Sequence, residues 1–164
     1  MAFGRSNCVK TIWHPDSHLS VKSLTPVLRD FGEFLPEPLS KVVDIDVYAE
    51  KLIRLSDIAL ATVNEEPAGV LAMYANDLDS HVAFISILSV SPKFRRLGIG
   101  KSLVSQSIER ARTRGMNSIT LKVVPNNEQA INLYNLFSFR VKASLPGRVL
   151  MEKELTSSAS LDVD

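Results

Sequence analysis

Apolar residues recur along the chain at two spacings, one typical of helices and the other of strands. Positions three and four residues apart repeat in four segments, which predicts helices over residues 19–31, 44–55, 101–114 and 127–137. Alternating or continuous apolar runs predict strands over residues 9–13, 57–63, 68–75, 81–90, 117–124, 139–144 and 147–155. Residues 34–43 contain two prolines and are predicted to form a loop.

The order of these segments predicts an α/β fold. Polar turns at residues 64–67 and 76–80 separate three strands, which is typical of antiparallel pairing. The strand–helix–strand order over residues 83–124 predicts a right-handed crossover and parallel pairing of its two strands. Gly115 is placed to end the helix of this unit, and Pro146 marks a final hairpin. We therefore expect a mixed, mostly antiparallel sheet of six or seven strands flanked by helices.

Length and composition narrow the class of protein. The 164 residues, 45% of them apolar, predict one domain over residues 1–155, followed by a disordered tail at residues 156–164. A net charge of +1 gives no general attraction to nucleic acid or to an anionic membrane. The single cysteine, Cys8, excludes an internal disulfide and suits a reducing compartment. His14 and His18 lack metal-ligand spacing, so we expect no metal site.

No apolar run approaches the length of about 18 residues that a membrane span requires. The first ten residues also lack the apolar core of a signal peptide. These features predict a cytoplasmic location.

One short segment between a predicted strand and a predicted helix indicates a phosphate site. It reads Arg95-Arg96-Leu97-Gly98-Ile99-Gly100. Two glycines allow the backbone to approach a ligand closely, and the following helix N-terminus adds about half a positive charge. Backbone N–H groups and this charge together favour a phosphate or pyrophosphate.

Two familiar phosphate motifs do not fit this segment. A Walker A loop would end at Gly100-Lys101-Ser102, but its first glycine would fall on Arg95. A dinucleotide fingerprint would begin at Gly98, but its third glycine would fall on Leu103. The pattern that does fit is [QR]-x-x-G-x-G, beginning at Arg95.

With this pattern the chain resembles the GNAT superfamily, the acetyl-CoA-dependent N-acetyltransferases. A second family pattern follows in the right order, Asn127-x-x-Ala130-Ile131-x-Leu133-Tyr134, and Val90-x-Pro92 precedes the first. The family usually has glycine where this chain has Ser138, which affects the turn after the helix. The resemblance covers roughly residues 81–139.

The resemblance implies acetyl-CoA as co-substrate, no metal, and a sheet that splays where parallel pairing begins. It implies that Tyr134 is the general acid that protonates the departing thiolate and that Asn127 contacts the pantetheine arm. It implies cofactor contacts for the strand, loop and helix residues Leu88, Ser89, Val90, Arg95, Arg96, Leu97, Gly98, Ile99, Gly100, Lys101, Ser102, Asn127, Ala130 and Tyr134.

Elementary chemistry is consistent with these roles. A tyrosine with a pKa near 10 is protonated at neutral pH and can donate a proton to a thiolate. Seven helical residues turn through about 700°, so Asn127 and Tyr134 lie within about 20° of each other around their helix. Both side chains are therefore predicted to face one groove.

The acceptor side is less clearly encoded. A direct attack requires a neutral amine and hence a base, for which Glu65, Glu66, Asp77, Asp79 and His81 are candidates. Asp77 or His81 is preferred, because both flank the turn that leads into the cofactor strand. We expect a small-molecule amine as acceptor and place it near residues 34–48. Residues 38–48 and 74–77 are similar to family members that acetylate amino sugars, which is an analogy only.

Several alternatives remain open at this stage. Peptide N-termini, lysine side chains, polyamines and antibiotics are the other acceptors that stay open. A regulatory module that binds acyl-CoA without catalysis and a different nucleotide-binding domain are the alternatives from other classes. Dimers are common in the family, so a homodimer is also open.

Overall fold

The computed structural model describes residues 6–155 of the chain. The predicted disordered tail, residues 156–164, lies outside the described residues. The helices are α1 (Val21–Gly32), η1 (Leu39–Lys41), α2 (Ile45–Leu55), η2 (Pro92–Phe94), α3 (Ile99–Thr113) and α4 (Glu128–Leu136). The strands are β1 (Val9–His14), β2 (Asp57–Val63), β3 (Glu66–Tyr74), β4 (Val82–Val90), β5 (Ser118–Val123), β6 (Arg140–Leu145) and β7 (Arg148–Glu154).

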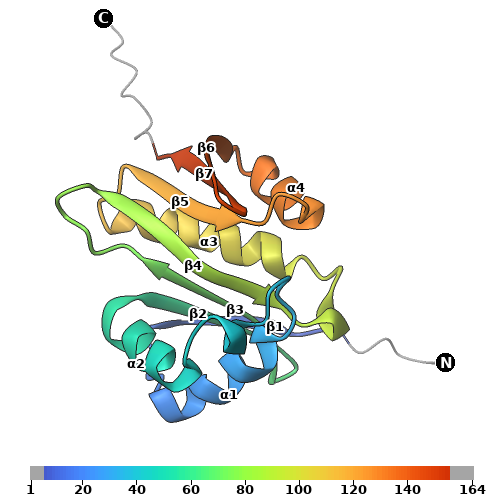
Figure 1. Ribbon diagram of the computed structural model, residues 1–164. Coiled ribbons are helices and arrows are strands. Elements are labelled where there is room, and N and C mark those ends of the chain that lie inside the picture. The colour runs from blue at the N-terminus through green and yellow to red at the C-terminus, as the bar shows by residue number, and fades with distance from the viewer. Residues whose placement is uncertain (1–5, 156–164) are drawn as a thin grey trace, which may run out of the picture.

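The seven strands form one mixed sheet in the order β1-β2-β3-β4-β5-β7-β6 (Figure 1). All neighbours are antiparallel except β4 and β5, which are parallel and joined through α3. The predicted α/β fold with a mostly antiparallel mixed sheet is confirmed.

The parallel pairing is short. Its register runs from Val82 opposite Ser118 to Ile85 opposite Leu121, so only the first half of β4 is paired with β5. β4 continues to Val90, and its last five residues, 86–90, have no partner on the β5 side in that register. The sheet therefore splays in its middle, as expected, and exposes an internal strand edge.

Helices cover both faces of the sheet, and each face has its own core. Figure 1 shows α1 and α2 together on one side, with α3 behind the sheet and α4 beside the β6–β7 hairpin. The core under α1 and α2 contains Leu24, Leu28, Leu52, Ile58, Val70 and Ile87. The core under α3 and α4 contains Leu71, Ala83, Ile85, Leu103, Val104, Ile119, Leu121, Tyr134, Phe139 and Met151.

A β-bulge in β4 changes which side chains face which core. Ala72 of β3 pairs with Ile87 and Met73 with Ile85, which leaves Ser86 as the extra residue. Before the bulge, Ile85 faces the α3 core, and after it Ile87 faces the α1–α2 core. Leu88 consequently packs on the α3 side, beside the splay. The sequence alone did not indicate this switch.

Local details differ from the sequence prediction at two turns. The β2–β3 turn consists of Asn64 and Glu65 alone, both with positive φ, so Pro67 lies inside β3 at a second register shift. The sequence favours Asn126 as the cap of a helix that begins at Asn127, but the structure begins α4 at Glu128 and uses Asn127 as its cap, since the Asn127 side chain accepts a hydrogen bond from the Ala130 N–H at 3.2 Å.

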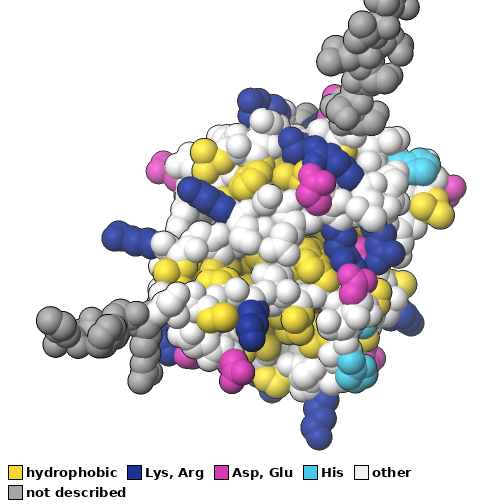
Figure 2. Space-filling model, turned by 180° about the vertical axis from the view of Figure 1, so that it is seen from behind, with side chains coloured by type: hydrophobic (Ala, Val, Ile, Leu, Met, Phe, Trp, Pro, Cys, Tyr) yellow, Lys and Arg dark blue, Asp and Glu magenta, His cyan; other side chains and the backbone are white. Residues whose placement is uncertain are grey.

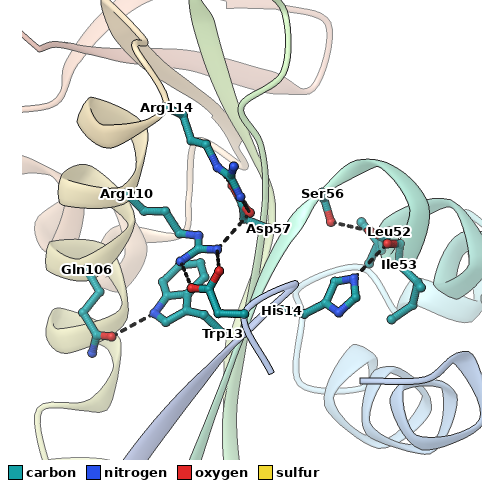
Figure 3. A network of polar contacts seen from close by, with 10 residues as sticks. Trp13, His14, Leu52, Ile53, Ser56, Asp57, Gln106, Arg110 and Arg114 are labelled. Atoms are coloured by element: carbon teal, nitrogen blue, oxygen red, sulfur yellow. Dashed lines mark hydrogen bonds and ion pairs between the residues drawn. The ribbon is translucent and has the colours of Figure 1, made fainter. Parts of the chain in front are cut away.

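A polar network ties the N-terminal strands to α3 (Figure 3). The buried carboxylate of Asp57 accepts hydrogen bonds from Arg110 at 3.1 Å and from Arg114 at 2.6 Å. The Arg110 guanidinium lies 4.7 Å from the centre of the Trp13 ring, whose indole N–H donates to Gln106 at 3.0 Å. These contacts fix α3, and therefore the loop before it, on the sheet.

Charge is distributed without a dominant sign. Figure 2, which views the molecule from behind, shows cationic and anionic side chains interspersed with apolar ones. Within residues 6–155, no helix is long and apolar enough to cross a membrane. Over the same described range, no cluster of three or more His, Cys, Asp or Glu side chains is arranged to hold a metal ion.

Candidate functional site

The glycine loop lies where the splayed end of β4 meets the N-terminus of α3. After η2 the backbone turns sharply, with positive φ at Arg96 (+68°) and at Gly98 (+73°). Gly98 is the N-cap of α3, and the first helical hydrogen bond runs from the Ser102 N–H to the Gly98 carbonyl at 3.0 Å. The amides before Ser102 are thus the unpaired donors of the helix end. A Cβ built on Gly98 would meet no atom within 4 Å, so open space adjoins this backbone.

The charges around the loop favour an anion. The first turn of α3 carries no acidic residue, and Arg95, Arg96 and Lys101 surround it. Within residues 6–155 these three side chains form no ion pair. Their positive charges add to the helix dipole, and together they make a site for a phosphate or pyrophosphate.

A cavity of about 470 Å³, the loop cavity, extends from this helix end along β4 to α4. Its walls include most of the predicted cofactor residues, namely Leu88, Ser89, Val90, Arg95, Arg96, Gly98, Ile99, Gly100, Lys101, Asn127, Ala130 and Tyr134. The internal edge of β4 forms one side of it. A ligand with an extended amide chain could therefore pair with backbone groups of residues 86–90, as an added strand would.

Tyr134 lies at the inner end of the loop cavity and is only 7% exposed. Burial raises the pKa of its phenol above the ordinary value, because the phenolate would be poorly solvated there. The side chain therefore stays protonated at physiological pH, so its hydroxyl has a proton to donate.

The turn after α4 holds Tyr134 in place. The Phe139 N–H donates to the Tyr134 carbonyl at 3.1 Å and the Ser138 N–H donates to the Asn135 carbonyl at 3.0 Å, which is a Schellman motif. Phe139 is fully buried, and its ring centre is 5.6 Å from that of Tyr134. Ser138 adopts the left-handed conformation, with φ of +66°, that glycine usually supplies at this position.

A second cavity of about 260 Å³, the face cavity, opens on the α1–α2 side of the splay. It lies between the α1–α2 connection and strands β4, β5 and β7, with Glu37, Phe84, Ser86, Lys122 and Arg148 among its lining residues. The two cavities share the walls Leu35, Pro36, Leu88, Asn127, Ala130 and Tyr134. Two ligands that enter from opposite faces would thus meet beside the Tyr134 side chain.

Hydrogen bonds fix β4 and the rim of the face cavity. The Ser86 hydroxyl at the bulge is 2.5 Å from the Tyr48 hydroxyl, which links β4 to α2. The buried Ser89 hydroxyl donates to the Phe31 carbonyl at 2.8 Å and ties β4 to the end of α1. At the rim, Arg148 donates to Glu37 at 2.8 Å and joins the β6–β7 turn to the α1–α2 connection.

Some predicted site residues do not line either cavity. Leu97 is exposed, and the Ser102 hydroxyl accepts a hydrogen bond from the Gln106 amide at 2.9 Å. Asp77 and His81 precede β4, and the seven residue steps from His81 to Leu88 span about 23 Å in a strand.

The two preferred base candidates are also engaged in local structure. The Asp77 carboxylate accepts bonds from the Ser80 hydroxyl at 2.6 Å and from two backbone N–H groups at 3.0 Å, which lowers its pKa. The His81 Nδ1 is 3.1 Å from the Gly115 carbonyl. The geometry does not bring either residue to the cavities, so the assignment of either as base stays a prediction.

Other lining residues were not assigned to the site from the sequence, although Leu133 belongs to the pattern that begins at Asn127. Phe34, Leu35 and Pro36 cover the loop cavity from the α1–α2 connection, which had been predicted only to approach the acceptor. Gln129, Asn132, Leu133 and Leu136 line it from α4. Their spacing of three, four and seven residues places them on one side of the helix, a signal that the sequence does contain.

Known proteins resemble this chain in both sequence and fold. A family model, described as the acetyltransferase (GNAT) family, matches residues 25–139. A curated relative, an uncharacterized N-acetyltransferase from Methanocaldococcus jannaschii, is 34% identical over 97 residues, or 57% of this chain and 43% of the relative. The chain therefore spans less than half of that relative's length.

Solved structures share the fold at low sequence identity. The ribosomal-protein-S18-alanine N-acetyltransferase from Escherichia coli superposes with a TM-score of 0.71 at 17% identity, covering 95% of this chain and 98% of that one. PaiA N-acetyltransferase from Thermoplasma acidophilum, solved in complex with coenzyme A, gives a TM-score of 0.68 at 17% identity, covering 90% and 99%.

Proposed function

Because the chain belongs to the GNAT family of acetyltransferases, we propose that it is an acetyl-CoA-dependent N-acetyltransferase with a small amine as acceptor. One observation carries this proposal above the others. The internal edge of β4, the unpaired amides at the start of α3 and the buried Tyr134 hydroxyl all border one continuous cavity. Acetyl-CoA has a group for each of these parts: its diphosphate suits the α3 amides, its extended amide chain suits the β4 edge, and its thioester suits the Tyr134 hydroxyl.

On the donor side, each part of the cavity has a distinct task. The amides of residues 99–101, with Arg95, Arg96 and Lys101, bind the diphosphate. Backbone groups of Leu88–Val90 pair with the extended arm, and the Asn127 amide contacts it from α4. Burial against Leu88 and Ala130 keeps water away from the thioester.

The reaction at the junction of the cavities is a direct transfer. The amine nitrogen attacks the thioester carbonyl, the C–S bond breaks, and Tyr134 gives its phenolic proton to the departing thiolate. An unpaired N–H of the β4 edge stabilises the negative charge on the carbonyl oxygen. The Tyr134 phenolate regains a proton from solvent or from the acetylated ammonium, so the enzyme is restored.

Removal of the amine proton is the step with the weakest structural support. Asp77 and His81 could act only through a long chain of water molecules, since neither borders the face cavity. Among residues 6–155, Glu37 is the one carboxylate on the wall of either cavity. We therefore place Glu37 beside Asp77 and His81 as a third candidate base.

The face cavity is the proposed acceptor site. Its size of about 260 Å³ and the Glu37–Arg148 ion pair at its rim suit a small amine, such as an amino sugar, better than a folded protein surface. A cytoplasmic location is part of the proposal and fits the single, exposed Cys8.

Calorimetric titration with acetyl-CoA, followed by a panel of amines assayed by release of free thiol, tests the proposed function. We expect saturable binding of acetyl-CoA and coenzyme A and amine-dependent thiol release. Binding without release for any amine would indicate a non-catalytic acyl-CoA module. Binding of ATP or NAD in place of coenzyme A would overturn the proposal.

A further inference from the structure

We propose that the acceptor carries a negatively charged group, a carboxylate or a phosphate, close to its amine, and that Lys122 is the residue that selects it. This inference rests on the proposed function, because it concerns the acceptor that enters the face cavity. It goes further by naming the chemical class of that acceptor and a residue that determines specificity.

The charged side chains that line the face cavity have a net positive charge. Three charged side chains line it, namely Glu37, Lys122 and Arg148. Glu37 and Arg148 neutralise each other through their 2.8 Å contact at the rim. Lys122 contributes one unmatched positive charge to the wall.

Lys122 is an exposed residue at the edge of the cavity whose ammonium lies beside an aromatic ring and forms no ion pair within the described residues. Its ammonium lies 5.9 Å from the centre of the Phe84 ring, which lines the same cavity from β4. Within the described residues, no Asp or Glu oxygen lies within 4.0 Å of it. A cation held over a ring keeps its N–H groups for another acceptor.

The acidic neighbours on the adjacent strand are already engaged. Lys122 lies opposite Leu150 in the β5–β7 register, and Glu152 is two residues along the same strand. The Glu152 carboxylate accepts a bond from Lys142 at 2.8 Å and one from the Ser118 hydroxyl at 3.3 Å. The Glu152 carboxylate is therefore bonded to β6 and does not pair with Lys122, so the Lys122 ammonium is available to a ligand.

The position of Lys122 relative to the reaction supports the same conclusion. Lys122 and Tyr134 border the same small cavity, so an acceptor that brings its amine to Tyr134 extends past the ammonium. A nearby positive charge disfavours the protonated form of the acceptor amine and lowers that amine's pKa. Lys122 thus favours the neutral nucleophile, which matters in a cavity with a single carboxylate on its wall.

The test compares acceptors that differ in an anionic group. Alanine is compared with alaninol for the carboxylate, and glucosamine 6-phosphate with glucosamine for the phosphate. For at least one pair we expect kcat/KM of the anionic member to be larger by about tenfold or more, which is the strength of one hydrogen bond to a charged group. The pair with the larger ratio identifies the source of the charge.

Variants assign the preference to Lys122. In Lys122→Gln the ratio should fall to about one, and in Lys122→Glu it should favour the neutral member. Lys51→Gln is the matched control, because the Lys51 ammonium also lies beside an aromatic ring, 5.5 Å from the centre of Tyr74, and Lys51 does not line the cavity. An unchanged ratio in Lys122→Gln, or a wild-type preference for neutral acceptors, would overturn the proposal.

A second readout separates this proposal from the proposed function. Calorimetry in the presence of coenzyme A compares N-acetylalanine with N-acetylalaninol and the two N-acetylglucosamine counterparts, and needs no turnover. We expect tighter binding of the anionic product in the wild type but not in Lys122→Gln. If coenzyme A binds and neutral amines are acetylated equally well, the acetyltransferase stands and the anionic acceptor is refuted. If coenzyme A itself does not bind, the proposed function fails first.

Discussion

The Tyr134 side chain is fixed from both directions along the chain. Asn127 begins α4 by capping the Ala130 N–H, and the Schellman turn at Ser138 ends it with Phe139 packed on the Tyr134 ring. A side chain held in this way loses little conformational freedom when a substrate arrives. Its hydroxyl therefore needs little reordering to serve as the proton donor that we propose.

Replacing this hydroxyl separates its chemical role from its packing role. In Tyr134→Phe the ring and its contact with Phe139 are kept, so we expect unchanged affinity for acetyl-CoA in calorimetry. Because a general acid typically contributes about 10²–10⁴-fold, kcat should fall by at least about a hundredfold. The measurement is thiol release under saturating substrates.

Tyr74→Phe is the matched control for this change. The Tyr74 hydroxyl is also buried, has no hydrogen-bond partner within residues 6–155, and borders neither cavity. Its removal should leave kcat unchanged. Equal losses of turnover and cofactor affinity in Tyr134→Phe would instead indicate a structural tyrosine.

Ser138 is a second residue whose replacement should change a measured quantity in a definite direction, here the free energy of unfolding. Its φ of +66° is unfavourable for a residue with a Cβ, and its side chain is exposed. Ser138→Gly should therefore raise the free energy of unfolding by about 1 kcal/mol in urea titrations. Ser144→Gly in the neighbouring strand β6 should lower it, since glycine is unfavourable in a strand.

At the scale of elements, the glycine loop and α3 act as one unit. The Asp57–Arg110–Arg114 network anchors the C-terminal half of α3, while Gly98 shapes its N-terminal end. The position of the phosphate site is therefore set by contacts that lie more than two helical turns away from it.

Gly98→Val tests the loop. Valine is strained at φ of +73°, and its side chain would enter the open space beside the backbone, so affinity for acetyl-CoA should fall by tenfold or more, about 1.4 kcal/mol. Gly115→Val is the control, because Gly115 has φ of +79°, equally open surroundings and no place in either cavity. Comparable loss of stability in both variants with loss of binding in one would support the phosphate role.

The sequence predicted the elements well and their junctions poorly. The order of helices and strands and the parallel β4–β5 pair follow from periodicity and from the crossover rule. The bulge at Ser86 could not be predicted, because an extra residue in a strand is decided by contacts on both of its faces. Because the sequence does not reveal the bulge, the apolar pattern of β4 does not predict which of its side chains border the splay.

Some residues of the candidate site could be predicted from local sequence patterns, and others could not. The glycine loop and the Asn127–Tyr134 spacing are local patterns, and both border the loop cavity as expected. Glu37, Phe84, Lys122 and Arg148 come from four distant segments and meet only through the sheet topology. Local patterns therefore indicated the donor side, whereas the acceptor side required the fold.

At the scale of the whole molecule, buried tyrosines couple stability to pH. Burial raises the pKa of Tyr48 to about 12, and it also raises the pKa of Tyr134. Above pH 10 the unfolded chain loses phenolic protons that the folded chain keeps, so the unfolded state binds fewer protons. The free energy of unfolding should therefore fall as the pH rises from about 10 to about 12.

Urea titrations between pH 8 and pH 12 measure this effect. Below pH 10 both states keep their phenolic protons, and these tyrosines should cause no slope. In Tyr48→Phe the fall above pH 10 should be shallower than in the wild type, whereas lysine deprotonation affects both proteins alike. Parallel curves for the two proteins would show that Tyr48 titrates normally in the folded state.

The brief contact between β4 and β5 also has a mechanical consequence. Four paired positions, the helix behind them and the Arg148–Glu37 contact join the two halves of the molecule, and residues 86–90 of β4 remain open to further backbone pairing. A donor molecule whose extended arm forms backbone hydrogen bonds with residues 86–90 would add contacts between the two halves. It would thereby stiffen the cavity walls that the acceptor contacts. Binding of the donor would then raise the affinity for the acceptor, and by linkage the acceptor would raise the affinity for the donor.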